Sequence, residues 1–262
     1  MTLLKFIKIK TMRNNKLAIF ATLFTAILFV TSCSPDEPET TTGKVVLEFE
    51  HVFDNDAFTL GDAYTTSYGD VVTPSTFKYY VSNIVISNDD GSLSYEVPNS
   101  YYIVDESVTE SLQIEVDGVP NGEYSKVAFT LGVDSTANVS GAQEGALDPA
   151  NGMFWSWNTG YIFLKLEGRT SNANEFRYHI GGFSGNANNI KYIDQTVPTG
   201  SMINVNGSTS TVHYMVDVAE FFKNPTDFDV EAVPTVMMPN ESSVIIANNY
   251  ADMYMIHHVH NE

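Results

Sequence analysis

Residues 152–168 read Gly-Met-Phe-Trp-Ser-Trp-Asn-Thr-Gly-Tyr-Ile-Phe-Leu-Lys-Leu-Glu-Gly. The stretch holds both tryptophans of the protein, Trp155 and Trp157, which point to the same face if the segment is extended. Residues 161–166 combine aromatic and aliphatic side chains, as is typical of a β-strand. Two tryptophans beside glycines form either the centre of a core or the wall of a site, and residue chemistry alone favours core packing.

Segments with the composition or alternation of β-strands recur on both sides of this stretch. They lie at 45–53, 77–87, 101–105, 111–116, 124–132, 176–180, 190–197, 202–205 and 211–218. Turn sequences rich in Gly, Asn and Asp separate them, and no segment shows a long helical period. The pattern predicts an all-β fold, an antiparallel β-sandwich of Ig-like or barrel-like form.

The N-terminus has the features of a bacterial lipoprotein signal peptide. Five basic residues precede an apolar run at 17–30, and Val-Thr-Ser-Cys at 30–33 resembles a lipobox. An uncleaved anchor is the alternative, but about 14 apolar residues are short for a membrane span. We therefore expect a signal peptide at 1–33 with lipidation of Cys33, a flexible linker at 34–43 and one domain at 44–262. We expect the protein in the bacterial cell envelope, where a lipid would anchor it at the outer membrane. It would face the periplasm or the cell surface.

The charge of the exported part excludes one class of partner. The first 33 residues hold five of the 13 basic residues and none of the 32 acidic ones, so the remaining chain has a formal charge of −24. Nucleic acid binding requires clustered Lys and Arg, so no nucleic acid partner is expected. An acidic domain attracts cations, although the acidity also serves simply to keep a secreted domain soluble. Cys33 is the sole cysteine, which excludes an intramolecular disulfide.

Histidines are the most informative candidate metal ligands. His51 falls on the apolar face of the 45–53 strand, and His179 precedes a Gly-Gly pair. His257 and His258 lie near the C-terminus with Met253 and Met255. Imidazole binds zinc and copper, and thioether sulfur favours Cu(I). The alternatives are a core role for His51 and an exposed, frayed tail that binds metal only weakly.

Signatures of catalysis are missing from the sequence. It contains no Gly-x-Ser-x-Gly, no His-Glu-x-x-His and no phosphate-binding glycine loop, and we expect no enzymatic activity. Carboxylates are too plentiful to exclude a glycosidase, which needs two of them facing each other across a cleft. The long loop at 133–151 also carries Ca²⁺-type oxygen ligands without the EF-hand pattern, at Asp134, Asn138, Glu144 and Asp148.

Five motifs together resemble the MbnP-like copper-binding domain family over residues 44–258. They are Phe-Glu-His at 49–51, Phe-Lys-Tyr-Tyr-Val-Ser-Asn-Ile at 77–84, Gly-Val-Asp-Ser at 132–135, the block at 146–168 and Tyr-His-Ile-Gly-Gly at 178–182. The block at 146–168 is the most specific of them. The resemblance implies an exported β-sandwich that binds copper.

In studied members of that family a tryptophan is oxidised to kynurenine, in some systems by a di-haem peroxidase-type partner, and joins histidines in holding copper. The resemblance places Trp155 and Trp157 in the tryptophan motif and His51 and His179 among the recurring histidines. We therefore expect a copper site with His51 and His179 as ligands, Trp155 or Trp157 beside them, and His257 or His258 as extra ligands. Such a protein would sequester or deliver copper without turnover.

A second hypothesis needs no metal. The protein would be a surface binding module for a protein or glycan, with the tryptophans as a stacking platform or as core. The two hypotheses differ in geometry, because a shared copper site requires the predicted histidines and tryptophans to converge within ligand reach.

Overall fold

The computed structural model describes residues 41–155 and 160–262. The predicted signal peptide with Cys33, most of the predicted linker and Trp157 lie outside the described residues. Within the described part of the chain, no helix is both long and apolar enough to cross a membrane. β1 begins at Thr42, two residues before the predicted start of the domain.

The first sheet contains five strands among the described residues, in the order β16-β14-β1-β2 with β7 also paired to β1. Their bounds are β1 (Thr42–Phe53), β2 (Asp56–Ala57), β7 (Gln113–Pro120), β14 (Thr209–Asp217) and β16 (Tyr254–Asn261). β1 and β14 are parallel, whereas β14 and β16 are antiparallel. The C-terminal histidines therefore lie on a paired strand and not on a frayed tail.

The second sheet contains nine strands among the described residues, in the order β12-β9-β4-β10-β11-β15, and β3, β5 and β6 also pair with β4. Their bounds are β3 (Tyr64–Thr65), β4 (Val71–Ser87), β5 (Ser94–Glu96), β6 (Tyr101–Asp105), β9 (Lys126–Leu131), β10 (Ile162–Thr170), β11 (Glu175–Gly181), β12 (Lys191–Thr196) and β15 (Thr235–Val236). A separate two-stranded ladder pairs β8 (Gly122–Tyr124) with β13 (Ile203–Val205).

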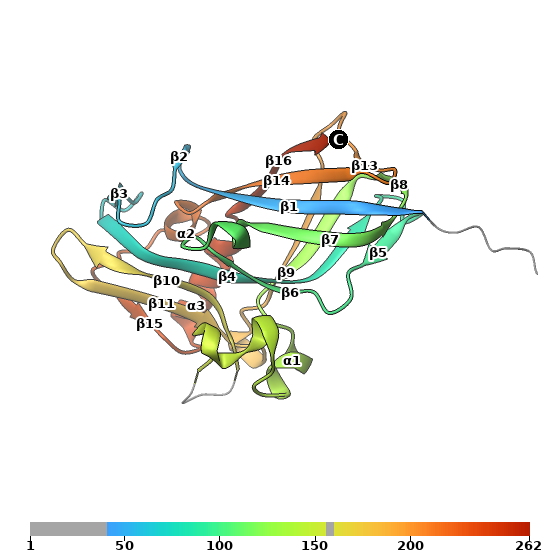
Figure 1. Cartoon of the computed structure of the whole chain (residues 1–262). Helices are drawn as coiled ribbons and strands as arrows, with labels where there is room; N and C mark the ends of the chain where they lie inside the picture. Colours follow the sequence, from blue (N-terminus) through green and yellow to red (C-terminus); the bar gives the residue numbers. More distant parts are fainter. Residues whose placement is uncertain (1–40, 156–159) are drawn as a thin grey trace, which may run out of the picture. The chain divides into compact units, whose positions relative to one another are not determined.

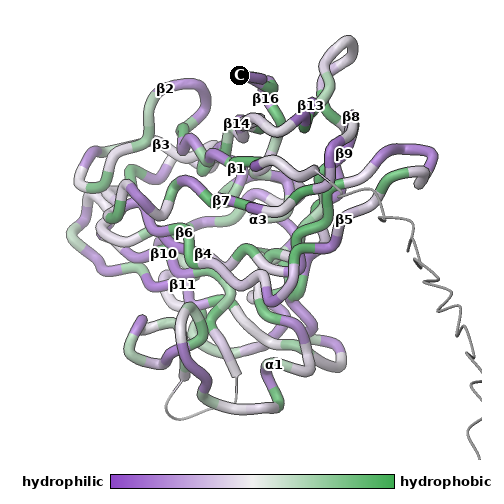
Figure 2. Tube along the Cα trace, turned by 45° about the vertical axis from the view of Figure 1, so that its right-hand side comes forward, coloured by the Kyte–Doolittle hydropathy of each residue, from purple (hydrophilic) through white to green (hydrophobic). Residues whose placement is uncertain are grey.

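The two large sheets enclose the main core, and Figure 1 shows β1, β7 and β14 running above β4, β10 and β11. β14 alternates strictly between buried and partly exposed residues, as a strand with one buried face should. Aromatic rings fill the interior, where Phe49 packs edge-on against Phe129 and stacks on Tyr214. Figure 2 shows hydrophobic residues along strands such as β9. The predicted all-β fold is confirmed, although β1–β14 and β11–β15 are parallel pairs.

Helices are few and short among the described residues. They are α1 (Ser135–Val139), α2 (Glu220–Lys223), α3 (Glu241–Ala251) and the 3₁₀ turns η1 (Thr109–Leu112), η2 (Gly145–Leu147), η3 (Pro149–Asn151) and η4 (Gly185–Ala187). The sequence pattern did not predict α3. This helix begins with a capping box in which the side chains of Asn240 and Ser243 each accept a backbone N–H of the other. Burial of Ile246 and Tyr250 then holds it against the sheet.

A second hydrophobic cluster is formed mostly by residues between 133 and 155 and between 161 and 163. It contains Tyr80, Val133, Ala137, Leu147, Met153, Trp155, Tyr161, Ile162 and Phe163. Trp155 is 3 % exposed, which confirms core packing for this tryptophan. Gly181 leaves room for its indole ring, since a Cβ atom there would lie 2.7 Å from Trp155 Cη2.

Candidate metal centre

Three histidines come together on the outer face of the first sheet. They are His213 on β14 and His257 and His258 on β16, and one ligand atom from each lies within 4.8 Å of the others. The Nδ1 atoms of His257 and His258 are 3.0 Å apart. Among the described residues this is the one group of at least three His, Cys, Asp or Glu side chains that could hold a single ion. We call it the three-histidine cluster.

A β-bulge in β16 brings the residues of this cluster together. Neighbouring residues of a regular strand point to opposite faces, so His257 and His258 would normally diverge. The pairing of β14 with β16 runs from Tyr214↔Ile256 directly to His213↔His258, which leaves His257 as the extra residue. Bulges re-aim side chains in this way and are common beside functional sites. The irregularity therefore brings both histidines to the side of the sheet on which His213 lies.

The local electrostatics favour a neutral imidazole at His258. Partial burial lowers the pKa of His258, and its neighbours His213 and His257 lower it further. The negative charge of Glu48 raises this pKa and so opposes the shift. A neutral imidazole has a free lone pair and can bind a metal, whereas an imidazolium cannot. Glu50 approaches from β1, with Oε2 3.4 Å from Nε2 of His213.

The cluster fits a metal ion by two criteria. His213 Nδ1 is buried and has no hydrogen-bond partner within the described residues, a state that costs free energy unless another group satisfies the atom. Metal–imidazole bonds are about 2.0–2.1 Å long, so two nitrogens on one ion lie roughly 3–4 Å apart. The observed separations reach this range with side-chain adjustments of about 1 Å or less.

His51, one of the predicted ligands, is a core residue. Its Nδ1 lies 2.6 Å from Oε2 of Glu106 and its Nε2 lies 3.0 Å from the hydroxyl of Tyr79. The ring packs edge-on against Phe77, and the residue is 5 % exposed. Both ring nitrogens therefore have partners within the protein.

His179 lies on β11 and is held by Glu167 of β10. The Nε2–Oε1 distance is 2.6 Å, so Glu167 orients the His179 ring through Nε2. Burial lowers the pKa of His179, while Glu167 opposes the shift. Gly181, two residues along the same strand, contacts the indole of Trp155. His179 and Trp155 thus approach the same region, but Trp157 lies outside the described residues.

The structure does not bring His51 and His179 to one point. The His51 ring packs on Phe77 of β4, which faces the core. The next residue, Lys78, faces the other way and pairs with Lys165, which in turn pairs with His179. Cross-strand partners share a face, so the second sheet separates the two histidines.

Three of the four predicted oxygen ligands in the 133–151 loop have structural roles, whereas the fourth, Glu144, is exposed. Asp134 caps α1, accepting from Thr136 and Ala137 N–H groups, and Asp148 caps η3. The Asn138 amide binds the carbonyl oxygens of Val133 and Asp134. These contacts give Asp134, Asn138 and Asp148 partners within the protein.

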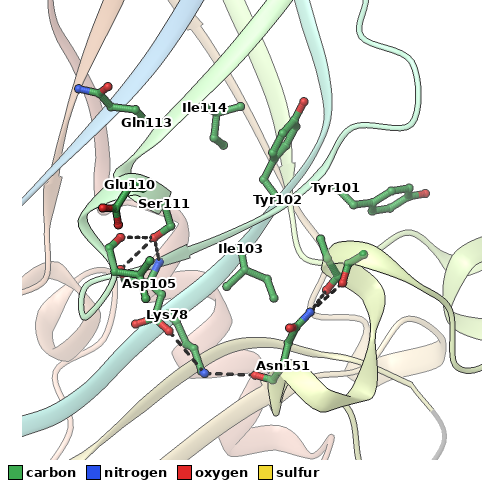
Figure 3. A pocket seen from close by; sticks show the side chains of 13 residues that line it. Lys78, Tyr101, Tyr102, Ile103, Asp105, Glu110, Ser111, Gln113, Ile114 and Asn151 are labelled. Carbon is green, nitrogen blue, oxygen red and sulfur yellow. Dashed lines mark hydrogen bonds and ion pairs between the residues drawn. The ribbon is translucent and has the colours of Figure 1, made fainter.

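An open cavity of about 500 Å³ lies between β6, η1, the start of β7 and the 145–151 segment (Figure 3). Lys78 reaches across its floor, donating to the Asn151 carbonyl 3.2 Å away and lying 3.5 Å from Asp105. Tyr101 and Tyr102 line another side. The lining contains charged, amide and tyrosine side chains, so this cavity offers polar and aromatic contacts.

The comparisons with known proteins agree on one family. The family model MbnP matches residues 42–238, a range that includes His51, Trp155, His179 and His213 and ends before His257. The structure of MbnP from Methylosinus trichosporium is similar, with a TM-score of 0.56 and 15 % identity over 84 % of this chain and 99 % of that one. No curated protein matches the chain. The match over most of its length shows that the chain belongs to the MbnP family.

Proposed function

We propose that this protein is an exported copper-binding protein that sequesters or delivers copper without catalysing a reaction. The observation that carries the proposal is the three-histidine cluster, His213 with His257 and His258. The motif resemblance implies copper, and the donor set agrees, because copper binds imidazole more tightly than other first-row divalent metals do. The high negative charge of the exported part would concentrate cations around the domain.

The proposed ligands come from two strands whose pairing is fixed by the fold. His213 would be anchored on β14, and the bulged strand β16 would supply His257 and His258. Glu50 beside His213 would orient that ring, as carboxylates commonly do for metal-bound histidines. Two of the three ligands are exposed, so an ion could enter and leave without opening the core.

Titration of Cu²⁺ into the full-length protein against a competing chelator tests this function. We expect one tight site per chain, and roughly 100-fold weaker binding after His257→Gln with His258→Gln, because two of three ligands are lost. His260→Gln is the matched control, since His260 is exposed on the same strand outside the cluster. Equal affinity in the double variant and the wild type would exclude the cluster as the copper site.

The ligand roles of His51 and His179 stay predictions, as does oxidation of Trp155 or Trp157 by a di-haem peroxidase-type partner. Trp155 contacts Gly181, which lies two residues from His179. This contact favours Trp155 and His179 as a second candidate copper location, separate from the three-histidine cluster. A surface binding module remains the alternative function, with the cavity beside Lys78 as its place of contact.

We also propose that the protein is anchored to the cell envelope by lipid on Cys33. The basic, apolar and lipobox segments at 1–33 support this. Cys33→Ser should move the protein from the membrane fraction to the soluble fraction of the envelope, because the thiol that carries the lipid is gone. Retention in the membrane fraction would indicate that the apolar segment itself is the anchor.

A further inference from the structure

The three-histidine cluster is part of a regular grid on the outer face of the first sheet. Strand register places Glu48, His213 and His258 in one row across β1, β14 and β16. The next row lies two residues further along β1 and β14. It contains Glu50, Met215 and Met255, again on β1, β14 and β16.

All positions of this grid face away from the core. On β14 the alternate residues Val212, Tyr214 and Val216 are fully buried, so His213 and Met215 between them point outward. On β16 Tyr254 and Ile256 are buried, and Met255 between them is 47 % exposed.

The two methionines are within reach of each other and of the cluster. Directly opposed residues of an antiparallel pair have Cβ atoms roughly 4.5–5.5 Å apart, and Met215 is directly opposite Met255. Successive outward residues on one strand are separated by about 6.5–7 Å. Methionine has three rotatable side-chain bonds, so either sulfur can span the step to the neighbouring imidazoles.

We propose that Met215 and Met255, together with an imidazole of the three-histidine cluster, form a subsite that binds copper as Cu(I). The inference rests on the proposed function and adds the oxidation state that the site accepts. Soft thioether sulfur selects Cu(I), whereas imidazole and carboxylate groups suit Cu(II). The histidine row and the methionine row therefore offer neighbouring ligand sets for the two states of one metal.

The competing interpretation is that Met215 and Met255 are a cross-strand apolar pair with no ligand role. Replacing both by leucine separates the two interpretations. Leucine keeps the size and the apolar character and removes only the sulfur, and such exchanges are well tolerated. Met238→Leu is the matched control, because Met238 is 52 % exposed and lies outside both rows.

The test measures Cu(I) affinity of the full-length protein without oxygen, by competition with a coloured cuprous chelator. We expect the Met215→Leu, Met255→Leu double variant to bind Cu(I) roughly tenfold or more weakly, a change of about 1.4 kcal/mol or more. Its Cu²⁺ affinity should stay within about twofold of the wild-type value, because the imidazoles are unchanged. X-ray absorption of the Cu(I)-loaded wild type should detect sulfur bound to copper.

The experiment distinguishes failure of the thioether subsite from failure of the proposed function. If the wild type binds Cu²⁺ at the histidines but the double variant retains its full Cu(I) affinity, or absorption detects nitrogen alone, the thioether subsite is wrong and the proposed function stands. If the wild type binds copper in neither state, both are wrong.

Discussion

Replacement of His51 by alanine should lower the free energy of unfolding by about 3 kcal/mol. The imidazole is buried, and its removal leaves the Glu106 carboxylate and the Tyr79 hydroxyl without their partner. It also leaves a cavity against Phe77. Denaturant unfolding of the metal-free protein measures the effect, with the midpoint shifting and the slope unchanged.

The same variant decides between a structural role and a ligand role for His51. We expect the folded His51→Ala protein to bind Cu²⁺ with wild-type affinity, because His51 is not part of the three-histidine cluster. His260→Ala is a suitable control for stability, since an exposed substitution usually changes it by about 0.5 kcal/mol or less. A stable His51→Ala protein that has lost its copper would instead assign His51 to the metal site.

Acidification should weaken copper binding at the cluster by at least roughly 100-fold between pH 7.5 and pH 5.5, because each imidazole ligand must lose its proton to bind. Copper affinity falls as the pH falls because protons compete with the metal. Protons occupy the same lone pairs as the metal, and imidazole normally protonates near pH 6.5. The lowered pKa of His258 keeps this residue neutral to lower pH than usual, so its share of the loss comes at the acidic end of the range.

Competition titrations at several pH values, with the chelator's own protonation taken into account, measure this dependence. The His257→Gln, His258→Gln variant should have a much flatter profile, since fewer ligand protons compete. An affinity that is constant down to pH 5.5 would mean that the copper ligands are not imidazoles.

Local sequence was sufficient to predict most strands. Alternation and aromatic content at 101–105 predicted β6 at both ends, and the run at 161–166 lies almost entirely within β10. Alternation also placed His51 on the buried face of β1. These successes share a cause, because period-two burial is a property of each strand by itself.

The parallel pairs and α3 could not be predicted in this way. β1 and β14 are far apart in sequence, and nothing within either strand specifies a parallel neighbour. α3 is short, and its stability depends on a capping box and on the burial of Ile246 and Tyr250 against other elements.

The candidate site was half predicted. His257 and His258 were recognised as candidate ligands, but His213 was not, because its place beside them depends on the β14–β16 register and on a bulge. The outward alternation of His213 with Met215 on β14 is the sequence signal that could have found it. His51 and His179 do not converge on one site as predicted. His51 of β1 packs against one face of the second sheet, and His179 lies on the other face.

Crystals of the protein grown with one equivalent of copper, measured at the copper absorption edge, would locate the ion directly. We expect one anomalous peak between β14 and β16, within bonding distance of His213, His257 and His258. A peak beside Trp155 and His179, with none at the cluster, would contradict this expectation and would place copper at the location that the family resemblance implies.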